Sequence, residues 1–279
     1  MATELAYTLI TPYSLIKSRT GGIIGRALSL SDLELVGANM YAPSDAFIDE
    51  YKATFENSSL DPKAREHVLA YLDENCRPEN RLGRPNRMML LLFRGENAVA
   101  CLKEVVGELS TEPRGDTISG TFGDLVPSQE GGAVYFEPAV LAAPDWETAR
   151  KQLRLFADRS ATDGGVLEDL MSYPQGVTPE TTLVMLKPEH FAERSARAGN
   201  IIDMFSRTGL YIVGSRLIQM SVKDANEFYG FLRGVFVKKL KGVVVQKLRR
   251  MVEESQAFDF RVSEQHLEEM ADVLKEANA

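Results

Sequence analysis

Cysteine, histidine and tryptophan are scarce in this sequence. The 279 residues include two cysteines, three histidines and one tryptophan. Two cysteines, Cys76 and Cys101, are too few for a disulfide framework, and the N-terminus does not resemble a secretion signal. No uncharged apolar run approaches the roughly 18–20 residues that a membrane span needs. We therefore expect a cytoplasmic protein with reduced thiols and no membrane segment.

An excess of positive charge is also missing. The chain has 32 basic and 40 acidic residues, a net charge of −8, whereas nucleic-acid phosphates select basic surfaces. This balance argues against a general nucleic-acid binder. It does not exclude binding of a single nucleotide, which needs only a local positive site. No group of histidine, cysteine and carboxylate residues has metal-ligand spacing, so we expect no metal site in the protein itself.

What the sequence does contain is an alternation of strand and helix patterns. Strand patterns occur at Tyr7–Ile10, Leu33–Met40, Met88–Phe93 and Ala133–Phe136. Helical patterns occur at 14–30, after the cap Ser44, at 62–74, at 97–107 and from Trp146 to about Asp158, and 110–132 is expected to be a loop. This order predicts an α/β sandwich, with helices packed against a largely antiparallel sheet.

A second copy of the opening pattern begins at Thr182. The run TLVMLKP is an apolar strand pattern that ends in Lys187-Pro188, and a helical stretch and a strand pattern at Leu210–Gly214 follow. From residue 235 the pattern is helical, with one strand candidate at Phe258–Phe260. The second copy therefore lacks its later half.

Three landmarks show that the two copies keep nearly the same spacing. They are a proline after the first strand pattern, the second strand pattern itself, and a tyrosine in the next helical stretch. The pairs are Pro12 with Pro188, Leu33–Gly37 with Leu210–Gly214, and Tyr51 with Tyr229. A repeat of this length indicates duplicated domains and not a solenoid.

Three segments follow from this pattern. Residues 1–160 are predicted to form a nearly complete domain, 161–181 a linker, and 182–279 a partial second domain that ends in helices. The partial domain would leave strand edges unpaired, which is costly. We therefore predict that it pairs with another chain or with the first domain, and that the protein is a homo-oligomer.

The two copies resemble the nucleoside diphosphate kinase family. In the second copy the resemblance lies in TLVMLKPEHF and LYIVGSRLIQMS, and in the first copy in RMMLLLFRGENAV and DTISGTFG. It covers most of the chain, and the order and spacing of the motifs carry it. The resemblance implies a ferredoxin-like α/β sandwich. It also implies transfer of a γ-phosphate from a nucleoside triphosphate to a diphosphate through a phosphohistidine, with Mg²⁺ on the phosphates.

The first copy has lost most of the residues that the resemblance assigns to this chemistry. The family's nucleophilic histidine lies in the motif Asn-x-x-His-Gly-Ser-Asp. The residue aligned with this histidine is Phe136, or Tyr135 if the alignment gap is placed differently. Neither ring can carry a phosphoryl group. Other family positions for ribose and phosphate contacts are occupied by Ala133, Ser119, Leu109, Thr11 and Lys103, of which only Lys103 keeps a positive charge.

The second copy keeps more of the phosphate side of the site. Lys187 and Tyr229 match the family's phosphate-contacting lysine and its supporting tyrosine, and Tyr51 is the first copy's equivalent of Tyr229. Phe236 is a candidate for the aromatic residue that stacks on the base. The resemblance thus gives Lys187, Tyr229, Phe236, Lys103 and Tyr51 as candidate nucleotide contacts. Lys187 also fits a plain surface lysine at the end of a strand.

The three histidines have two interpretations each. His67, His190 and His266 are either replacement nucleophiles or ordinary surface residues, and no Gly-Ser-Asp follows any of them. A run of basic residues without acids at 233–250 has the same ambiguity. It is either a binding face for phosphates or an acidic partner, or a solvated helix face that balances the acidic remainder.

Two functions are compatible with these residues. The first is a nucleoside-diphosphate-kinase-like protein without the nucleophile, which binds ATP, ADP or another nucleotide with Mg²⁺ or acts in assembly. The alternative is an active kinase whose site is completed by another chain or by sequence beyond residue 279.

Overall fold

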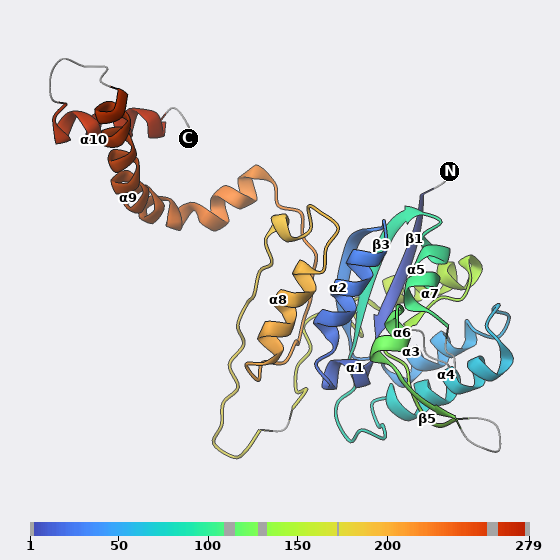
Figure 1. Ribbon diagram of the computed structural model, residues 1–279. Helices are drawn as coiled ribbons and strands as arrows, with labels where there is room; N and C mark the ends of the chain where they lie inside the picture. Colours follow the sequence, from blue (N-terminus) through green and yellow to red (C-terminus); the bar gives the residue numbers. More distant parts are fainter. Residues whose placement is uncertain (1–2, 109–114, 128–132, 172, 256–261, 277–279) are drawn as a thin grey trace. The chain divides into compact units, whose positions relative to one another are not determined.

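The computed structural model describes residues 3–108, 115–127, 133–171, 173–255 and 262–276 (Figure 1). The chain divides into two compact units, Met1–Leu217 and Ile218–Ala279. The predicted domain boundary at residue 182 differs from this division, because residues 182–217 make their contacts within the first unit. Compact units reflect contacts and not duplication, so the predicted domain limits stay predictions.

The first unit contains a four-stranded antiparallel sheet. Its strands are β1 (Thr3–Ile10), β2 (Glu34–Tyr41), β3 (Met88–Glu96) and β6 (Val140–Ala142), in the spatial order β2-β3-β1-β6. Helix α2 (Thr20–Leu30) connects β1 to β2, and α5 (Ala98–Val106) lies between β3 and β6. This strand order with two crossover helices is the βαββαβ ferredoxin-like arrangement. The predicted fold class is confirmed.

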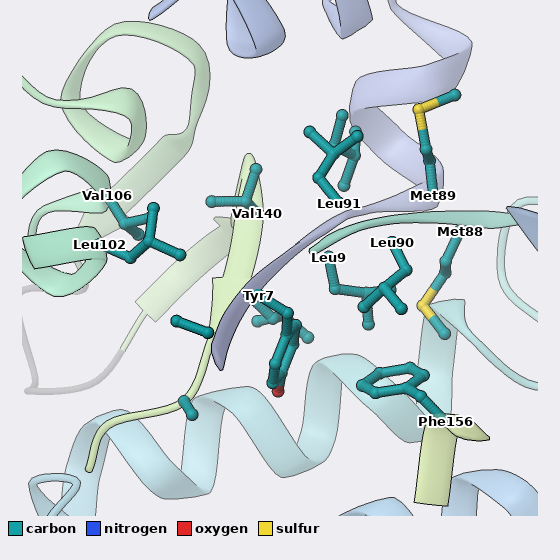
Figure 2. Close-up of a cluster of buried hydrophobic side chains, with 14 of the residues drawn as sticks. Tyr7, Leu9, Met88, Met89, Leu90, Leu91, Leu102, Val106, Val140 and Phe156 are labelled. Carbon is teal, nitrogen blue, oxygen red and sulfur yellow. The ribbon is translucent and has the colours of Figure 1, made fainter. Parts of the chain in front are cut away.

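Both faces of the sheet are covered, as Figure 2 shows. Leu91 of β3 lies on the same face as Leu102 and Val106 of α5, whereas Tyr7 and Leu90 lie on the face of Phe156 in α7 (Trp146–Arg159). The burial of both faces explains the unbroken apolar run of β3, because neighbouring side chains on a strand point to opposite faces. Burial of each such side chain contributes about 1.5–3 kcal/mol.

Side-chain caps fix where several helices begin. Ser44 accepts a hydrogen bond from the Phe47 amide at the start of α3 (Asp45–Ala53), as predicted. Asp61 caps α4 (Pro62–Asn75), and Asp145 caps α7 through the Thr148 amide at 2.8 Å. Such caps satisfy amides that lack a partner inside the helix. The local sequence therefore determines these boundaries.

The predicted helix over 14–30 is wrong as one element. The structure has α1 (Pro12–Ile16) and then α2, separated by a break in which Ser18 has a φ of 54°. This left-handed conformation ends the first helix. The helical spacing of apolar residues continues across the break, and for this reason the pattern predicts one helix.

The predicted loop over 110–132 is also wrong in its described part. It contains α6 (Ile118–Phe122) and β4 (Asp124–Pro127), while 109–114 and 128–132 lie outside the described residues. Strand β4 pairs with β5 (Ala133–Glu137) in a separate two-stranded sheet. The predicted strand at 133–136 exists but does not join the main sheet. Its place beside β1 is taken by β6, which is too short to recognise from sequence.

The strands predicted for the second copy are absent. Neither Thr182–Lys187 nor Leu210–Gly214 forms a strand, and Leu183 is 81% exposed. The candidate strand at 258–260 lies outside the described residues. A strand needs hydrogen-bonding partners, and the partial copy offers no sheet for these two segments to join.

The helices of the second copy do recur at the predicted spacing. Helix α8 (Arg197–Ser206) is the counterpart of α2, and α9 (Val222–Ser255) is the counterpart of α3. Both counterparts are shifted along the chain by the same amount, from Thr20 to Arg197 and from Asp45 to Val222. Helix α9 extends well beyond Tyr229 and continues to Ser255. Helices satisfy their own backbone hydrogen bonds and so form without a sheet.

Helix α8 packs closely on α2. A Cβ atom added at Gly199 would overlap backbone atoms of Gly21 and Gly25, so the two helices cross where side chains are missing. Ala198 beside this crossing is fully buried. The segment before α8 also joins the first unit, since Asp163 accepts a hydrogen bond from the Ser44 amide at 2.7 Å. Helix α8 of the partial copy thus packs on the first domain, whereas the predicted pairing of its strand edges stays a prediction.

The second unit consists of α9 and α10 (Glu264–Glu276), which follow each other in Figure 1. Val245, Leu267 and Ala271 form a small buried cluster. Lys241 pairs with Asp272 at 2.9 Å, and Arg249 pairs with Glu264. Part of the predicted basic face is therefore occupied by acids of α10. Of the helices described, none is both long and apolar enough to cross a membrane.

Candidate functional site

The first-copy counterpart of Lys187 is closed off. Thr11 is fully buried at the end of β1, where its hydroxyl donates to the Pro138 carbonyl at 2.8 Å. The same oxygen accepts from the Ser14 amide and caps α1. A side chain that is buried and hydrogen-bonded in this way offers nothing to a phosphate. The position of the predicted phosphate contact has become a structural cap.

Tyr51 belongs to the core and not to an open site. Its hydroxyl lies 2.7 Å from that of Tyr7, which donates to Gln152 Oε1 at 2.6 Å. Gln152 in turn donates to Thr54 Oγ1 at 2.8 Å. Burial raises the pKa of Tyr51, and the hydrogen bond with Tyr7 opposes that rise. This closed network joins β1, α3 and α7, so Tyr51 is not placed to contact a ligand.

Tyr135 and Phe136 lie on β5, away from the main sheet. The Phe136 ring packs 5.5 Å from the His67 ring and 6.1 Å from the Tyr71 ring, both on α4. Tyr135 packs against Tyr13 at 6.4 Å. The predicted equivalent of the nucleophile is thus covered by α4, although this contact places one of the three histidines beside it.

A second placement of the nucleophile follows from the sheet. The strand next to β1 is β6, and the segment Ala139–Asp145 ends in an aspartate with the spacing of Asn-x-x-His-Gly-Ser-Asp. With this alignment Ala139 stands for the asparagine and Ala142 for the histidine. Ala142 pairs with Thr8 of β1 and has no group that can carry phosphate. Under either alignment the histidine position holds an apolar or phenolic side chain.

Charged groups near Tyr135 are paired with one another. The Tyr13 hydroxyl donates to Asp124 Oδ2 at 2.8 Å, and Arg19 pairs with the same oxygen at 3.1 Å. Burial opposes ionisation of Asp124, yet the hydrogen bonds from Tyr13 and Arg19 outweigh it and lower its pKa. Lys17 and Arg19 lie over the Tyr13 ring at 5.4 and 5.1 Å. These cations already have partners in the protein.

Glu137 is a buried acid at the end of β5. Arg81 pairs with one of its carboxylate oxygens, and the other has no hydrogen-bond partner among the described residues. Burial raises the pKa of Glu137, and the nearby charge of Arg81 opposes that rise. The loop that supplies Arg81 therefore compensates a charge that the sheet would otherwise leave unpaired.

The remaining first-copy candidates do not gather at a site. Lys103 is exposed on α5, and the Ser119 hydroxyl on α6 is buried without a partner among the described residues. Leu109 lies outside the described residues, and Ala133 lies in β5 with its side chain outside them. The structure does not bring these residues together around a cavity.

The second-copy candidates are divided between the two units. Lys187 is exposed before the short helix η1 (Pro188–His190), in the first unit. Tyr229 is exposed on α9 in the second unit, where its ring packs on Phe228 at 5.0 Å. Phe236 lies within α9, but its side chain is outside the described residues. These three residues do not form a site within one compact unit.

Each histidine lies on a helix outside the sheet. His67 is half-buried on α4, and His266 is exposed on α10. His190 ends η1, three residues after Lys187, and its Nδ1 is buried without a partner among the described residues. No group of three metal-binding side chains occurs in the described part of the chain.

Sequence reasoning misses one buried cation. Arg87, just before β3, is 8% exposed and lines two adjacent hollows of the first unit. The sequence signal is present, because an arginine directly precedes the buried run Met88–Phe93. The signal is hidden because residues 77–87 have an irregular polar pattern in which several arginines occur.

Comparison with a family model places the sequence similarity in the second copy. Residues 180–253 match the family model described as nucleoside diphosphate kinase. A nucleoside diphosphate kinase of Campylobacter fetus is 42% identical over 50 residues, which cover 18% of this chain and 35% of that protein. The chain therefore spans about a third of the length of this relative.

Solved structures with similar folds include two kinases of this kind. The Aquifex aeolicus nucleoside diphosphate kinase is 16% identical, with a TM-score of 0.40, and the match covers 56% of this chain and 95% of that chain. The Borrelia burgdorferi enzyme, solved with bound vanadate and ADP, is 14% identical with a TM-score of 0.42, over 62% and 94%. Neither score supports an argument about individual site residues.

Proposed function

We propose that this chain, a member of the nucleoside diphosphate kinase family, does not perform phosphohistidine transfer and acts as an interaction module. One observation carries the proposal. The first copy, which has the complete sheet, holds Ala142 or Phe136 at the histidine position and a buried cap, Thr11, at the lysine position. Transfer needs an imidazole nucleophile and cations for the developing charge on the phosphoryl group. The first copy offers neither.

The interaction surface is supplied by the second copy. The two segments with strand patterns do not join a sheet, and both expose large apolar side chains. These are Leu183, Val184, Leu210 and Tyr211. Segments of this kind are templates for pairing with another chain. We infer self-association through them, which agrees with the homo-oligomer that the sequence predicts.

The catalytic part of the proposal is tested by labelling. The protein is incubated with Mg²⁺ and ATP labelled on the γ-phosphate, next to an active nucleoside diphosphate kinase as positive control. We expect no acid-labile phosphate on the protein. Acid-labile label that maps to His67, His190 or His266, and that is lost when that histidine is replaced by glutamine, contradicts the proposal.

The assembly part is tested by mass in solution. Light scattering on the full chain is expected to give a mass above that of a monomer, and Leu183→Glu is expected to lower it. Lys63→Glu, on the exposed surface of α4, is the matched control for the added charge. A monomeric mass for the unmodified protein rules out self-association.

Nucleotide binding is proposed only for the second copy, where Lys187 is free of the contacts that bury Thr11. Calorimetric titration of ADP and ATP with Mg²⁺ measures it, and Lys187→Ala is expected to weaken binding. Binding that survives this substitution unchanged places the nucleotide elsewhere.

An active kinase is the second candidate. The observation in its favour is that the family match over 180–253 includes Lys187 and Tyr229, the two phosphate-side residues that persist. In this case another chain, or sequence beyond residue 279, supplies Asn-x-x-His-Gly-Ser-Asp. A longer chain with this motif that exchanges phosphate between nucleotides supports the candidate. A longer chain with the motif that fails to exchange phosphate counts against it.

A further inference from the structure

The hollow beside Arg87 is the one feature of the described first unit that combines a buried cation with free hydroxyls. It measures about 130 Å³, and its walls come from the α1–α2 turn, from Arg87 and from the segment 206–212. It does not include Thr11, Tyr51 or Lys187, so it is separate from every predicted nucleotide contact. Its size is below the roughly 300–1,000 Å³ of pockets for drug-sized ligands, so it suits a small ion or a single group.

Arg87 carries a charge that no acid of the described chain balances. Its Nη1 donates to the Ile212 carbonyl at 2.6 Å, and its guanidinium lies 5.6 Å from the centroid of the Tyr211 ring. No ion pair of Arg87 occurs among the described residues. The charged neighbour is Arg84, a second cation, which also lines the adjoining hollow. Buried charges are normally paired, so this arrangement calls for an anion.

The other walls supply hydrogen-bond donors and no acid. Ser18, Thr20 and Ser206 line the hollow, and within the described chain their hydroxyls have no hydrogen-bond partner. None of the residues around either hollow is aspartate or glutamate. Asp203 of α8 is turned toward Gly21, and the charge that acts on its pKa is that of Arg207 and not of Arg87. The site thus has a cation, neutral donors and no competing carboxylate.

We propose that this hollow binds a small oxyanion, a phosphate group, through Arg87 and the hydroxyls of Ser18, Thr20 and Ser206. A tetrahedral oxyanion accepts hydrogen bonds in several directions, which suits three hydroxyls and one guanidinium. The anion joins the α1–α2 turn to the segment 206–212 that leads from α8, and so strengthens the attachment of the second copy to the first unit.

The test is a calorimetric titration of the full chain with inorganic phosphate at constant ionic strength, with chloride as the reference salt. We expect saturable binding, and about tenfold weaker affinity for Thr20→Val, which removes one hydroxyl at nearly constant volume. Arg87→Met is expected to abolish binding. Since Arg87 also holds Ile212, a variant that leaves the arginine in place is needed, and Thr20→Val and Ser206→Ala serve this purpose.

Lys63→Ala is the matched control, because it removes an exposed cation on α4, outside the hollow. Unchanged phosphate affinity in Lys63→Ala, with loss in Thr20→Val, supports the site. Absence of saturable phosphate binding, or wild-type affinity in Thr20→Val and Ser206→Ala, overturns it. Arg87 is then only a structural link to Tyr211 and Ile212.

A second arm of the same titration distinguishes the source of the phosphate group. AMP that binds more tightly than inorganic phosphate, with the same loss in Thr20→Val, assigns the site to the phosphate of a larger molecule that extends into the adjoining hollow. If inorganic phosphate binds more tightly than AMP, the site is assigned to the free phosphate ion. Both results are independent of the labelling test, because neither involves transfer to a histidine.

Discussion

The two copies of one pattern within this chain have reached different structures. The first copy forms a four-stranded sheet with helices on both faces, whereas the second copy forms the helices without the strands. Corresponding helices keep one constant spacing, from Thr20 to Arg197 and from Asp45 to Val222, so the local sequence still directs the helices in both copies. The difference shows that strands need the remainder of the domain, and that helices do not.

The same comparison explains the fate of the site residues. In the first copy both residues are buried: Thr11 caps a helix, and Tyr51 belongs to a hydrogen-bond network. In the second copy Lys187 and Tyr229 stay exposed, because no sheet exists to bury them or to position them. Thr11 and Tyr51 are thus buried in the fold of the first copy, whereas Lys187 and Tyr229 lie outside the sheet that the structure describes.

The largest expected effect is on core packing in corresponding segments of the two copies. Leu9→Ala, at a fully buried position of β1, is expected to lower the free energy of unfolding by about 2–5 kcal/mol. Leu183→Ala, in the corresponding segment of the second copy and 81% exposed, is expected to change it by less than about 0.5 kcal/mol. Urea unfolding measures both values. A large loss for Leu183→Ala would mean that this segment is packed in solution.

The next effect concerns the crossing of α2 and α8. Gly199→Ala inserts a methyl group against backbone atoms of Gly21 and Gly25, and is expected to cost about 1–3 kcal/mol and to increase proteolysis between residues 188 and 217. Gly230→Ala is the control, since nothing lies within 4 Å of an added Cβ there and alanine favours a helix. Equal cleavage rates for both variants would show that α8 is not held by this crossing.

A smaller effect is expected for the matched tyrosines. Tyr51→Phe breaks the hydrogen bond with Tyr7 and is expected to cost about 0.5–1.5 kcal/mol. Tyr229→Phe, at an exposed position, is expected to cost less than about 0.5 kcal/mol in the same unfolding experiment. Equal costs would indicate that the Tyr229 hydroxyl has a partner of its own, and would weaken the contrast between the copies.

The smallest effect is a pH dependence of stability that arises in the first copy at Glu137. Because burial raises the pKa of Glu137, folding favours its protonated form. The resulting stability is complete below the unfolded pKa of about 4.3 and is lost as pH rises through the folded value. Glu137→Gln is expected to remove this decline. Arg81→Met is expected to steepen it, since it removes the paired charge. An unchanged profile in both variants contradicts the assignment.

The sequence indicated much of the first copy. Ser44 as a cap, the strand at Met88–Phe93 and the antiparallel sheet with packed helices were predicted from local patterns, and the structure confirms them. The errors have physical causes. A break at Ser18 leaves the apolar spacing intact, and β6 has three residues, too few for a periodic signal. The prediction of the candidate site residues depended on the alignment with the family motif. Phe136 lies in the β4–β5 hairpin and not in the main sheet.

The sequence by itself determined the resemblance to the family and the spacing of the repeat, because both are properties of residue order. Tertiary structure decided which predicted residues are accessible. Thr11 is buried against the Pro138 carbonyl and Tyr51 in the network with Tyr7 and Gln152, whereas Lys187 stays exposed because its segment joins no strand. It also decided that Arg87 lies beside Ser18, Thr20 and Ser206, which contacts between distant parts of the chain alone can bring together.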